Sequence, residues 1–196
     1  MNSNNQKAVF LDRDGTINVE KNYIKSPEEI QLIPGSSDAI AMFNRAGYLV
    51  FGITNQSGVA RGYFKVEDVL KVNARVSELV SGEGGEIKEI FFCPHHTEGK
   101  IPEYTIKCEC RKPGKGMIIS AAEKYSLDLD GMIVIGDKIC DVELGYRMNA
   151  KTAMVGTGYG NEEYKALLAS GSRLPDVYAK DLLEAAKTFL GQKPGE

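Results

Sequence analysis

The stretch Phe10-Leu11-Asp12-Arg13-Asp14-Gly15-Thr16 decides the fold of this chain. It begins inside an apolar run at 8–11, which predicts a short buried strand. Two carboxylates then stand two residues apart just beyond the strand, and Gly15 allows the backbone to turn tightly there. Ligands of parallel sheets bind at the carboxyl ends of the strands. We therefore expect Asp12 and Asp14 to face one pocket at such an edge.

Apolar runs and amphipathic stretches alternate along the rest of the chain. The runs at 48–53, 87–92, 132–135, 152–155 and 177–178 predict further strands. The spacing of apolar residues predicts helices that begin near Ser36, cover 65–80, start near Met117, lie near 141–148 and cover 180–190. Strands that alternate with helices predict an α/β, doubly wound, Rossmann-like parallel sheet with helices on both faces. We expect one domain over residues 1–196.

Composition narrows the class of protein. The formal net charge of -3 gives no bulk electrostatic reason to bind nucleic acid or an anionic membrane. No run of residues approaches the length of a membrane span, and residues 1–7 are polar and lack the apolar core of a secretion signal. We therefore predict a cytoplasmic protein with no nucleic-acid or membrane partner. No exposed heptad pattern is visible, so a monomer is expected.

The two acids of the opening stretch can divide the work of a phosphoryl transfer. Asp12 would attack phosphorus and form an acyl phosphate, and Asp14 would protonate the leaving oxygen and then take a proton from water. A divalent cation would offset their repulsion. Solvated surface acids and a calcium-binding loop are the competing interpretations. A calcium loop needs Gly at position six and Glu at position twelve, where this chain has Ile17 and Tyr23.

Three more polar positions follow predicted strands or precede predicted helices. Thr54 follows the second strand, where its hydroxyl and the next amides suit a phosphate. Lys112 precedes a helix and follows Arg111, so the two cations could recognise a phosphoryl group. Asp137 ends the fourth strand and is followed by Lys138. Taken alone, each has an ordinary alternative as a turn residue or a surface charge.

Together these stretches resemble, in order, the four signatures of the haloacid dehalogenase (HAD) superfamily over essentially the whole chain. The resemblance implies a phosphatase in which Asp12 is the nucleophile and Asp14 the general acid and base. It implies Mg²⁺ held by Asp12, Asp137 and the backbone carbonyl of Asp14. The implied phosphate and substrate contacts in these signatures are Arg13, Thr54, Asn55, Gln56, Ser57, Arg111, Lys112 and Lys138.

A polar stretch between the third strand and the next helix carries a second possible metal site. Cys93 and His95 are followed by Cys108 and Cys110, a set of three thiols and one imidazole that is typical of structural zinc. The spacing differs from the common C-x-x-C pattern. His96 could replace His95, but the alternate spacing favours His95. A polar loop with incidental cysteines is the alternative. A zinc clamp over about 93–110 would hold the two cations that follow it over the site.

The zinc-like loop narrows the resemblance to two phosphatase families within the superfamily. The C-x-H…C-x-C-R-K-P arrangement and the stretches at 10–18 and 54–62 look like the D-glycero-D-manno-heptose 1,7-bisphosphate phosphatases. That resemblance implies release of the C7 phosphate of a small-molecule sugar bisphosphate, in nucleotide-activated heptose biosynthesis for bacterial surface glycans. It also implies substrate contacts from Glu20, Asn22 and Tyr23. Histidinol-phosphate phosphatase is the alternative family, and a non-catalytic phosphate-binding or zinc-loop interaction module is the second alternative.

The number of residues between the signatures indicates whether the chain has a cap domain, an inserted domain that would cover the site. From Thr16 to Thr54 there is room for a loop, a helix and a strand, and from Thr54 to Lys112 for a helix, a strand and the cysteine-containing loop. Neither interval leaves space for an inserted folded domain. We therefore predict an open site shaped by loops.

Overall fold

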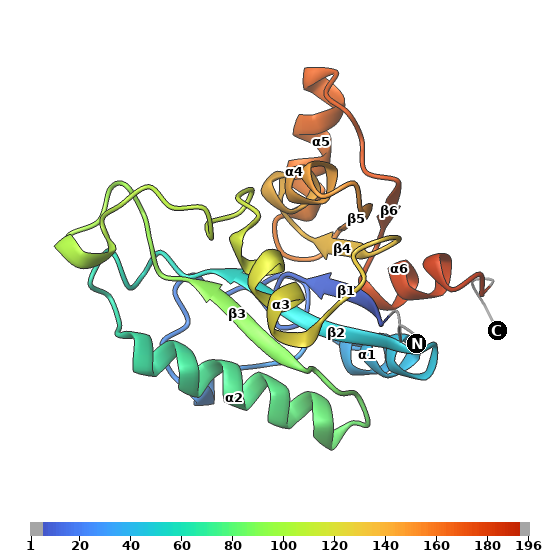
Figure 1. Cartoon of the computed structure of the whole chain (residues 1–196), viewed down its shortest axis with the longest axis horizontal. Coiled ribbons are helices and arrows are strands. Elements are labelled where there is room, and N and C mark those ends of the chain that lie inside the picture. The colour runs from blue at the N-terminus through green and yellow to red at the C-terminus, as the bar shows by residue number, and fades with distance from the viewer. Residues whose placement is uncertain (1–5, 193–196) are drawn as a thin grey trace.

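In the computed structural model, which describes residues 6–192, six parallel strands form one sheet (Figure 1). The strands are β1 (Lys7–Leu11), β2 (Tyr48–Asn55), β3 (Glu89–Cys93), β4 (Ile133–Gly136), β5 (Lys151–Val155) and β6 (Val177–Ala179). Their order is β3-β2-β1-β4-β5-β6, so the chain builds outward from β1 first in one direction and then in the other. The boundary between β1 and β4 is therefore the topological switch point, where open sheets of this type bind ligands.

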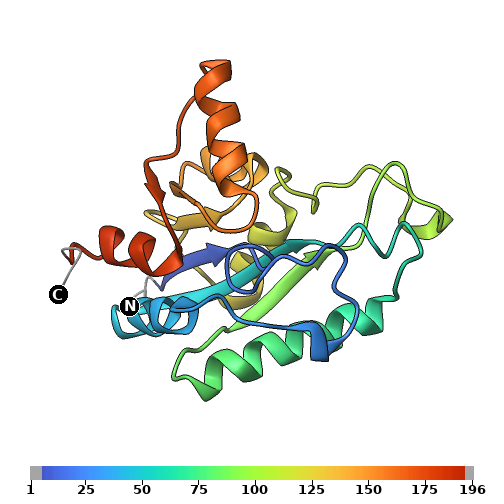
Figure 2. The same ribbon diagram turned by 180° about the vertical axis from the view of Figure 1, so that it is seen from behind.

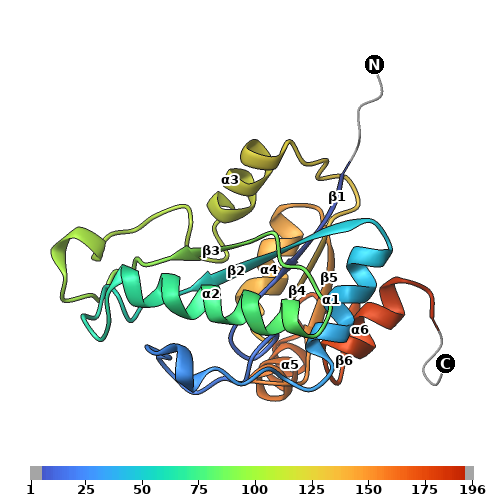
Figure 3. The ribbon, with the colours of Figure 1, turned by 90° about the horizontal axis from the view of Figure 1, so that it is seen from below.

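Helices cover both faces of the sheet, as predicted. The helices are α1 (Ser36–Arg45), α2 (Val66–Gly82), α3 (Gly116–Tyr125), α4 (Ile139–Arg147), α5 (Gly160–Ser170) and α6 (Leu182–Phe189). Two 3₁₀ turns, η1 (Pro27–Glu29) and η2 (Pro102–Tyr104), lie in loops. Figure 3 shows α2 and α3 on opposite sides of the sheet.

The alternation of side chains along β1 explains the two cores. Val9 and Leu11 point to one face, where they pack with residues of α1, α2 and α6. Ala8 and Phe10 point to the other face and pack with residues of α3 and α4. Because both faces are buried, the strand is apolar at every position from Ala8 to Leu11, and the residue that follows it, Asp12, is polar. The apolar run therefore ends where the site begins.

Most element boundaries agree with the sequence-based predictions to within two residues, but α5 was not predicted. Only Gly160 and Leu167 of this helix are buried, so its sequence carries no continuous apolar stripe. The helix packs against α4 and β5 through a small cluster that includes Val142, Met154 and Leu167. Its position after β5 brings Tyr159 and Glu163 to the mouth of the candidate site.

The connections between strands leave the switch point uncovered by any second domain within residues 6–192. β1 and β2 are joined by a loop, η1 and α1, and β2 and β3 by a loop and α2. The long loop between β3 and α3 extends away from the sheet beside the segment that precedes α2 (Figure 2). No helix in the described part of the chain is long and apolar enough to cross a membrane.

Candidate active site

The first part of the site is the turn that follows β1. The Asp12 amide donates to the carbonyl of Ile135 at 2.9 Å, so the backbone ladder with β4 extends to this residue. Its carboxylate is 4% exposed and accepts a hydrogen bond from the Arg13 amide at 2.8 Å. Gly15 then has φ +88°, a left-handed conformation that favours glycine. Asp12 is thus fixed at the switch point with its carboxylate held by its own loop.

Three buried carboxylates meet beside this turn. Asp12, Asp137 at the end of β4, and Asp141 in the first turn of α4 offer oxygens that all lie within 4.8 Å of one another. The Tyr159 amide donates to Asp137 Oδ2 at 2.8 Å, whereas Asp137 Oδ1 is buried with no hydrogen-bond partner among the described residues. Burial, and then the neighbouring charge of Asp12, raise the pKa of Asp137 to about 8. Lys138 Nζ lies 4.0 Å from Asp137 Oδ1, beyond hydrogen-bond distance. An acid oxygen without a hydrogen bond in a carboxylate cluster fits a divalent cation.

Asp141 belongs to this cluster but was not among the predicted site residues. It follows the β4 signature by four residues and reads as an ordinary helix-start acid, because its Oδ2 accepts a hydrogen bond from the Lys138 amide at 3.2 Å. The fold adds a second role, since its carboxylate also faces Asp12 and is 1% exposed. Burial raises the pKa of Asp141 to about 6, although Lys112 opposes the shift.

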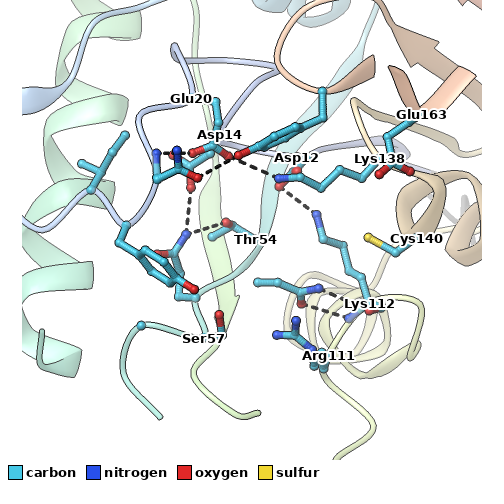
Figure 4. A pocket seen from close by; sticks show the side chains of 17 residues that line it. Asp12, Asp14, Glu20, Thr54, Ser57, Arg111, Lys112, Lys138, Cys140 and Glu163 are labelled. Carbon is cyan, nitrogen blue, oxygen red and sulfur yellow. Dashed lines mark hydrogen bonds and ion pairs between the residues drawn. The ribbon is translucent and has the colours of Figure 1, made fainter. Parts of the chain in front are cut away.

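Lys112 supplies the positive charge at the centre of the cluster. Its Nζ lies 2.8 Å from Asp12 Oδ1 and 2.6 Å from Asp141 Oδ1, and donates to the Ile53 carbonyl at 2.8 Å. Figure 4 shows this side chain pointing at Asp12 from the loop that precedes α3. Burial alone would lower the pKa of Lys112, but the two carboxylates outweigh burial and raise it. The lysine is therefore a fixed cation next to Asp12.

Asp14 follows Asp12 by two residues and lines the same pocket. Its carboxylate accepts hydrogen bonds from Asn18 Nδ2 and Gln56 Nε2, each at 2.9 Å. Arg13 donates to both of its oxygens, from Nε at 3.1 Å and from Nη2 at 2.7 Å. Burial alone would raise the pKa of Asp14, but Arg13 and then these hydrogen bonds lower it. Asp14 is therefore held as a carboxylate in this arrangement.

Arg13 requires a correction to the sequence-based prediction. We expected this residue to contact the phosphate, but its side chain is fully buried and does not line the pocket. Its guanidinium is engaged by Asp14 and by Asn73 of α2. All three guanidinium nitrogens are engaged within the protein and the side chain lies outside the cavity lining, so we assign it no substrate contact.

The carboxyl end of β2 and the loop that follows it line the pocket and are tied to Lys112. Gln56 Nε2 donates to Thr54 Oγ1 at 2.8 Å as well as to Asp14. Asn55 makes two hydrogen bonds with the backbone of Lys112: its Nδ2 donates to the carbonyl at 3.2 Å, and its Oδ1 accepts from the amide at 3.0 Å. These bonds hold the end of β2 against the loop that carries Lys112.

The resulting cavity has a volume of about 420 Å³. The residues that line it and that we predicted are Asp12, Asp14, Glu20, Asn22, Tyr23, Thr54, Asn55, Gln56, Ser57, Arg111, Lys112 and Lys138. Ile24, Gly58, Cys140, Tyr159 and Glu163 also line it and were not predicted. Asp137 lies behind the wall and is fully buried. Tyr159 could not be inferred from any motif, because it belongs to the loop before the unpredicted helix α5.

The mouth of the cavity is built from paired polar and aromatic side chains. Lys138 Nζ lies 3.3 Å from Glu20 Oε2 and 4.8 Å from the centre of the Tyr159 ring. The hydroxyl of Tyr159 donates to Asn22 Oδ1 at 2.8 Å. Asn22 and Tyr23 both have φ +52°, which is uncommon for residues other than glycine. The loop that carries them is thus shaped by specific contacts rather than by chain flexibility.

A second cluster lies where the loop after β3 returns to the sheet. The ligand atoms of Cys93, His95, Cys108 and Cys110 all lie within 4.8 Å of one another. The sulfur atoms are 3.1 to 3.5 Å apart, and His95 Nδ1 lies 3.3 Å from the sulfur of Cys110. His96 points elsewhere, with its Nδ1 accepting from the Glu98 amide at 3.0 Å. The fold therefore brings together the four residues that we predicted and leaves the alternative histidine outside the cluster.

This second cluster is directly continuous with the active site. Arg111 follows Cys110 in sequence, and its Nη1 donates to the carbonyl of His95 at 3.3 Å. Both Arg111 and Lys112 line the cavity. The cysteine-containing loop thus determines where two of the cavity's cations lie.

Comparisons with known proteins match this description. Residues 109–185 match the family model Hydrolase_like, described as HAD-hydrolase-like. The chain is 35% identical over 189 residues to a D-glycero-beta-D-manno-heptose-1,7-bisphosphate 7-phosphatase of Pasteurella multocida, covering 96% of this chain and 99% of the relative. The enzyme of the same name from Rhodopseudomonas palustris is 46% identical over 136 residues, covering 69% of this chain and 76% of the relative.

A solved structure agrees as well. The D,D-heptose 1.7-bisphosphate phosphatase from B. bronchiseptica, crystallised with magnesium and phosphate, is 32% identical and superimposes with a TM-score of 0.81. The match covers 95% of this chain and 99% of that chain. The parallel sheet and the acid pair after its first strand define a HAD-like hydrolase. Within that class, the chain belongs to the D-glycero-D-manno-heptose-1,7-bisphosphate 7-phosphatase family.

Proposed function

We propose that the protein is a phosphoric monoester hydrolase that removes the C7 phosphate of D-glycero-D-manno-heptose 1,7-bisphosphate and leaves heptose 1-phosphate. The observation that carries this proposal is the convergence of Asp12, Asp14 and Lys112 in one cavity, in a chain that aligns with such phosphatases over nearly its full length. The product would serve nucleotide-activated heptose biosynthesis. Neither comparison nor geometry favours the histidinol-phosphate alternative.

The first half-reaction follows from the positions of the two acids. A carboxylate oxygen of Asp12 attacks phosphorus, the bond between phosphorus and the C7 oxygen breaks, and Asp14 gives its proton to that oxygen. Arg13 favours the ionised form of Asp14, but a bound phosphate dianion favours the protonated form by like-charge repulsion. Asp14 would therefore take up its proton as the substrate binds.

The second half-reaction reverses the role of Asp14. A water molecule attacks the phosphorus of the aspartyl phosphate, and Asp14 takes its proton as the bond to Asp12 breaks. Inorganic phosphate then leaves, and Asp12 is restored as a carboxylate. Lys112, Thr54 and the amides of the loop after β2 hold the phosphoryl oxygens during both steps. Arg111 and Lys138, together with Glu20, Asn22 and Tyr23, are proposed to contact the rest of the substrate.

Two metals complete the proposal. Asp12, Asp137 and the backbone carbonyl of Asp14 are proposed to hold Mg²⁺. The Asp137 oxygen that has no hydrogen bond and the nearby carboxylate of Asp141 support this assignment. When bound, Mg²⁺ would neutralise charge on the acids and on the phosphoryl group. Zn²⁺ is proposed on the second cluster, because three thiols and one imidazole that converge in this way are a donor set typical of structural zinc. The structural zinc would hold Arg111 and Lys112 in place.

A turnover panel tests the function. Purified protein would be assayed for phosphate release from both anomers of heptose 1,7-bisphosphate, from histidinol phosphate and from simple sugar phosphates, with and without Mg²⁺. We expect Mg²⁺-dependent preference for a heptose bisphosphate, and loss of that turnover in Asp12→Asn. A clear preference for histidinol phosphate would overturn the substrate assignment. Wild-type turnover by Asp12→Asn would overturn the nucleophile.

A further inference from the structure

One polar side chain connects α2 to the proton-transfer residue of the site. Asn73 lies on the buried face of α2 and is 6% exposed. Its Oδ1 accepts a hydrogen bond of 2.6 Å from Arg13 Nη1, across 60 positions of sequence. Arg13 in turn donates to both oxygens of Asp14. A continuous chain of side-chain hydrogen bonds therefore runs from the helix to the catalytic acid.

Asn73 is an exception on its helix. The other buried residues of α2 are Val69, Val72, Val76 and Val80. Asn73 Nδ2 is buried and has no hydrogen-bond partner among the described residues, and a buried donor without a partner destabilises a fold. Only the acceptor half of its amide is used. A residue that served packing alone would be apolar here, as its neighbours are, so the bond to Arg13 is the feature that distinguishes this position.

The geometry of the guanidinium makes a third contact important. A guanidinium is planar, and its Nε and Nη2 already bind the two oxygens of Asp14 as a fork. Two contacts to one carboxylate leave the pair free to shift together. The third contact, from Nη1 to Asn73, ties the plane of the fork to a helix that is packed on the sheet core. The position of the Asp14 carboxylate is then set by α2 and not only by its own loop.

We propose that Asn73 is a positioning residue that acts through Arg13 to hold the Asp14 carboxylate where it can transfer a proton to the leaving oxygen. The proposal rests on the proposed phosphatase function. Asn73 itself does not line the cavity, so it touches no reacting atom. Asn18 and Gln56 also donate to Asp14, so removal of Asn73 weakens proton transfer without abolishing it.

The need for a proton from Asp14 depends on the leaving group of the substrate. Substrates with different leaving groups therefore distinguish a misplaced Asp14 carboxylate from general damage to the active site. A sugar alkoxide is a poor leaving group and needs the proton of Asp14, whereas p-nitrophenolate leaves without one. The ratio kcat/KM reports the steps up to the first irreversible one, here release of the alcohol. A residue that positions Asp14 should therefore affect kcat/KM for the sugar phosphate far more than kcat/KM for p-nitrophenyl phosphate.

The experiment compares Asn73→Leu, Asn73→Ala and Asn73→Asp with the wild-type enzyme in the presence of Mg²⁺. Leucine removes the acceptor and keeps the volume, alanine removes it without risk of a clash, and aspartate restores an acceptor oxygen at the same place. We expect kcat/KM for heptose 1,7-bisphosphate to fall about 10- to 100-fold in the leucine and alanine variants. We expect kcat/KM for p-nitrophenyl phosphate to stay close to the wild-type value, and Asn73→Asp to recover most of the loss.

Three outcomes would overturn the inference. The first is an equal fall in kcat/KM for both substrates in the leucine and alanine variants, which indicates structural damage. The second is an unchanged kcat/KM for both substrates in these variants. The third is a kcat/KM for the sugar phosphate that is as low in the aspartate variant as in the leucine variant. The alanine variant decides the matter if the leucine variant does not fold. The wild-type measurements test the proposed function separately: if another alkyl phosphate is the preferred substrate, the comparison is made with that substrate.

Discussion

Lys112 Nζ and Asp141 Oδ1 lie 2.6 Å apart, with both side chains 1% exposed. The pair joins the end of the cysteine-containing loop to the first turn of α4, two segments that meet only in the folded protein. Asp12 lies 2.8 Å from the same ammonium. One buried cation thus counters at least two of the three clustered carboxylates, and the stability of the site depends on it.

Replacement of Lys112 by Met should destabilise the metal-free protein at neutral pH. Removing one partner of a buried ion pair costs about 3–5 kcal/mol, because the remaining charge has no compensation. Here two such charges, on Asp12 and Asp141, would remain. Urea unfolding with a chelator present measures the effect, and turnover should be lost as well. Part of the stability should return at lower pH, where Asp141 takes up a proton.

A matched control for this lysine is Lys124→Met. Lys124 also pairs with a carboxylate, lying 2.7 Å from Glu89, but its side chain is 56% exposed. Exposed ion pairs contribute only about 0–1 kcal/mol, so this variant should unfold almost as the wild type does. If Lys112→Met is as stable as Lys124→Met at neutral pH, the buried cation does not hold the acid cluster together.

The stability of the metal-free protein should fall as the pH rises through the neutral range. The pKa of Asp137 is about 8 in the fold against an ordinary value of 3.8, and that of Asp141 is about 6. Between the ordinary and the folded values, the folded state holds protons that the unfolded chain has released, so raising the pH favours unfolding. The window runs from about pH 4 to pH 8. Asp14 has a lowered pKa, so its opposite contribution lies below this window.

Urea unfolding at pH 5.5 and pH 8.5 checks this trend. With a chelator, the free energy of unfolding should be lower at pH 8.5, by on the order of 2 kcal/mol. Mg²⁺ should restore stability most at the higher pH, where the acids are ionised. Asp137→Asn, which cannot ionise, should show a weaker pH dependence. Stability that increases from pH 5.5 to pH 8.5 without metal would contradict the raised pKa values.

Replacement of His95, and not of His96, should weaken the zinc site that we propose in the cysteine-containing loop. In His95→Asn the cluster keeps three thiols but loses its imidazole, so bound zinc should fall and kcat/KM should drop, because Arg111 and Lys112 follow the cluster directly. His96→Asn is the matched control, since that ring lies outside the cluster. Metal content measured by mass spectrometry and kcat/KM report the two effects. Equal zinc content in the two variants would exclude His95 as a ligand.

The parts of the site that could be predicted are those that local sequence specifies. Asp12 stands where an apolar run ends, and the end of a buried parallel strand is where ligands bind. His95 was preferred to His96 from spacing, and the fold places it in the cluster. In both cases the backbone over a few residues determines where the side chain lies, so the pattern was sufficient.

The parts that could not be predicted depend on contacts between distant segments. Asp141 looks like any acid at the start of a helix, and only the arrival of Lys112 from another loop makes it part of the site. Arg13 was placed among the substrate contacts by the resemblance to a known signature, but in the fold its guanidinium binds Asp14 and Asn73. Asn73 lies in a helix with no motif around it, and α5 has too little buried apolar surface to be visible in the sequence.

Gly158 should be required for Asp137, which we propose as a Mg²⁺ ligand, to adopt its observed position. A Cβ at this glycine would overlap Asp137 Oδ2 and come close to the Cα of Gly15. The next amide, of Tyr159, is the one that donates to the same oxygen. Gly158→Ala should therefore displace Asp137, weaken Mg²⁺ binding in calorimetric titrations by about tenfold or more, and reduce kcat/KM in parallel.

The matched control for Gly158 is Gly171, which separates backbone strain from the contact with the acid. Both glycines have a positive φ, +55° at Gly158 and +65° at Gly171, so alanine strains the backbone at each by about 1–2 kcal/mol. A Cβ at Gly171 meets nothing within 4 Å. Gly171→Ala should thus be less stable than the wild type but bind Mg²⁺ with unchanged affinity. If both variants bind Mg²⁺ like the wild type, the close approach of Gly158 does not position Asp137; if both bind it weakly, strain in the fold and not the contact controls the site.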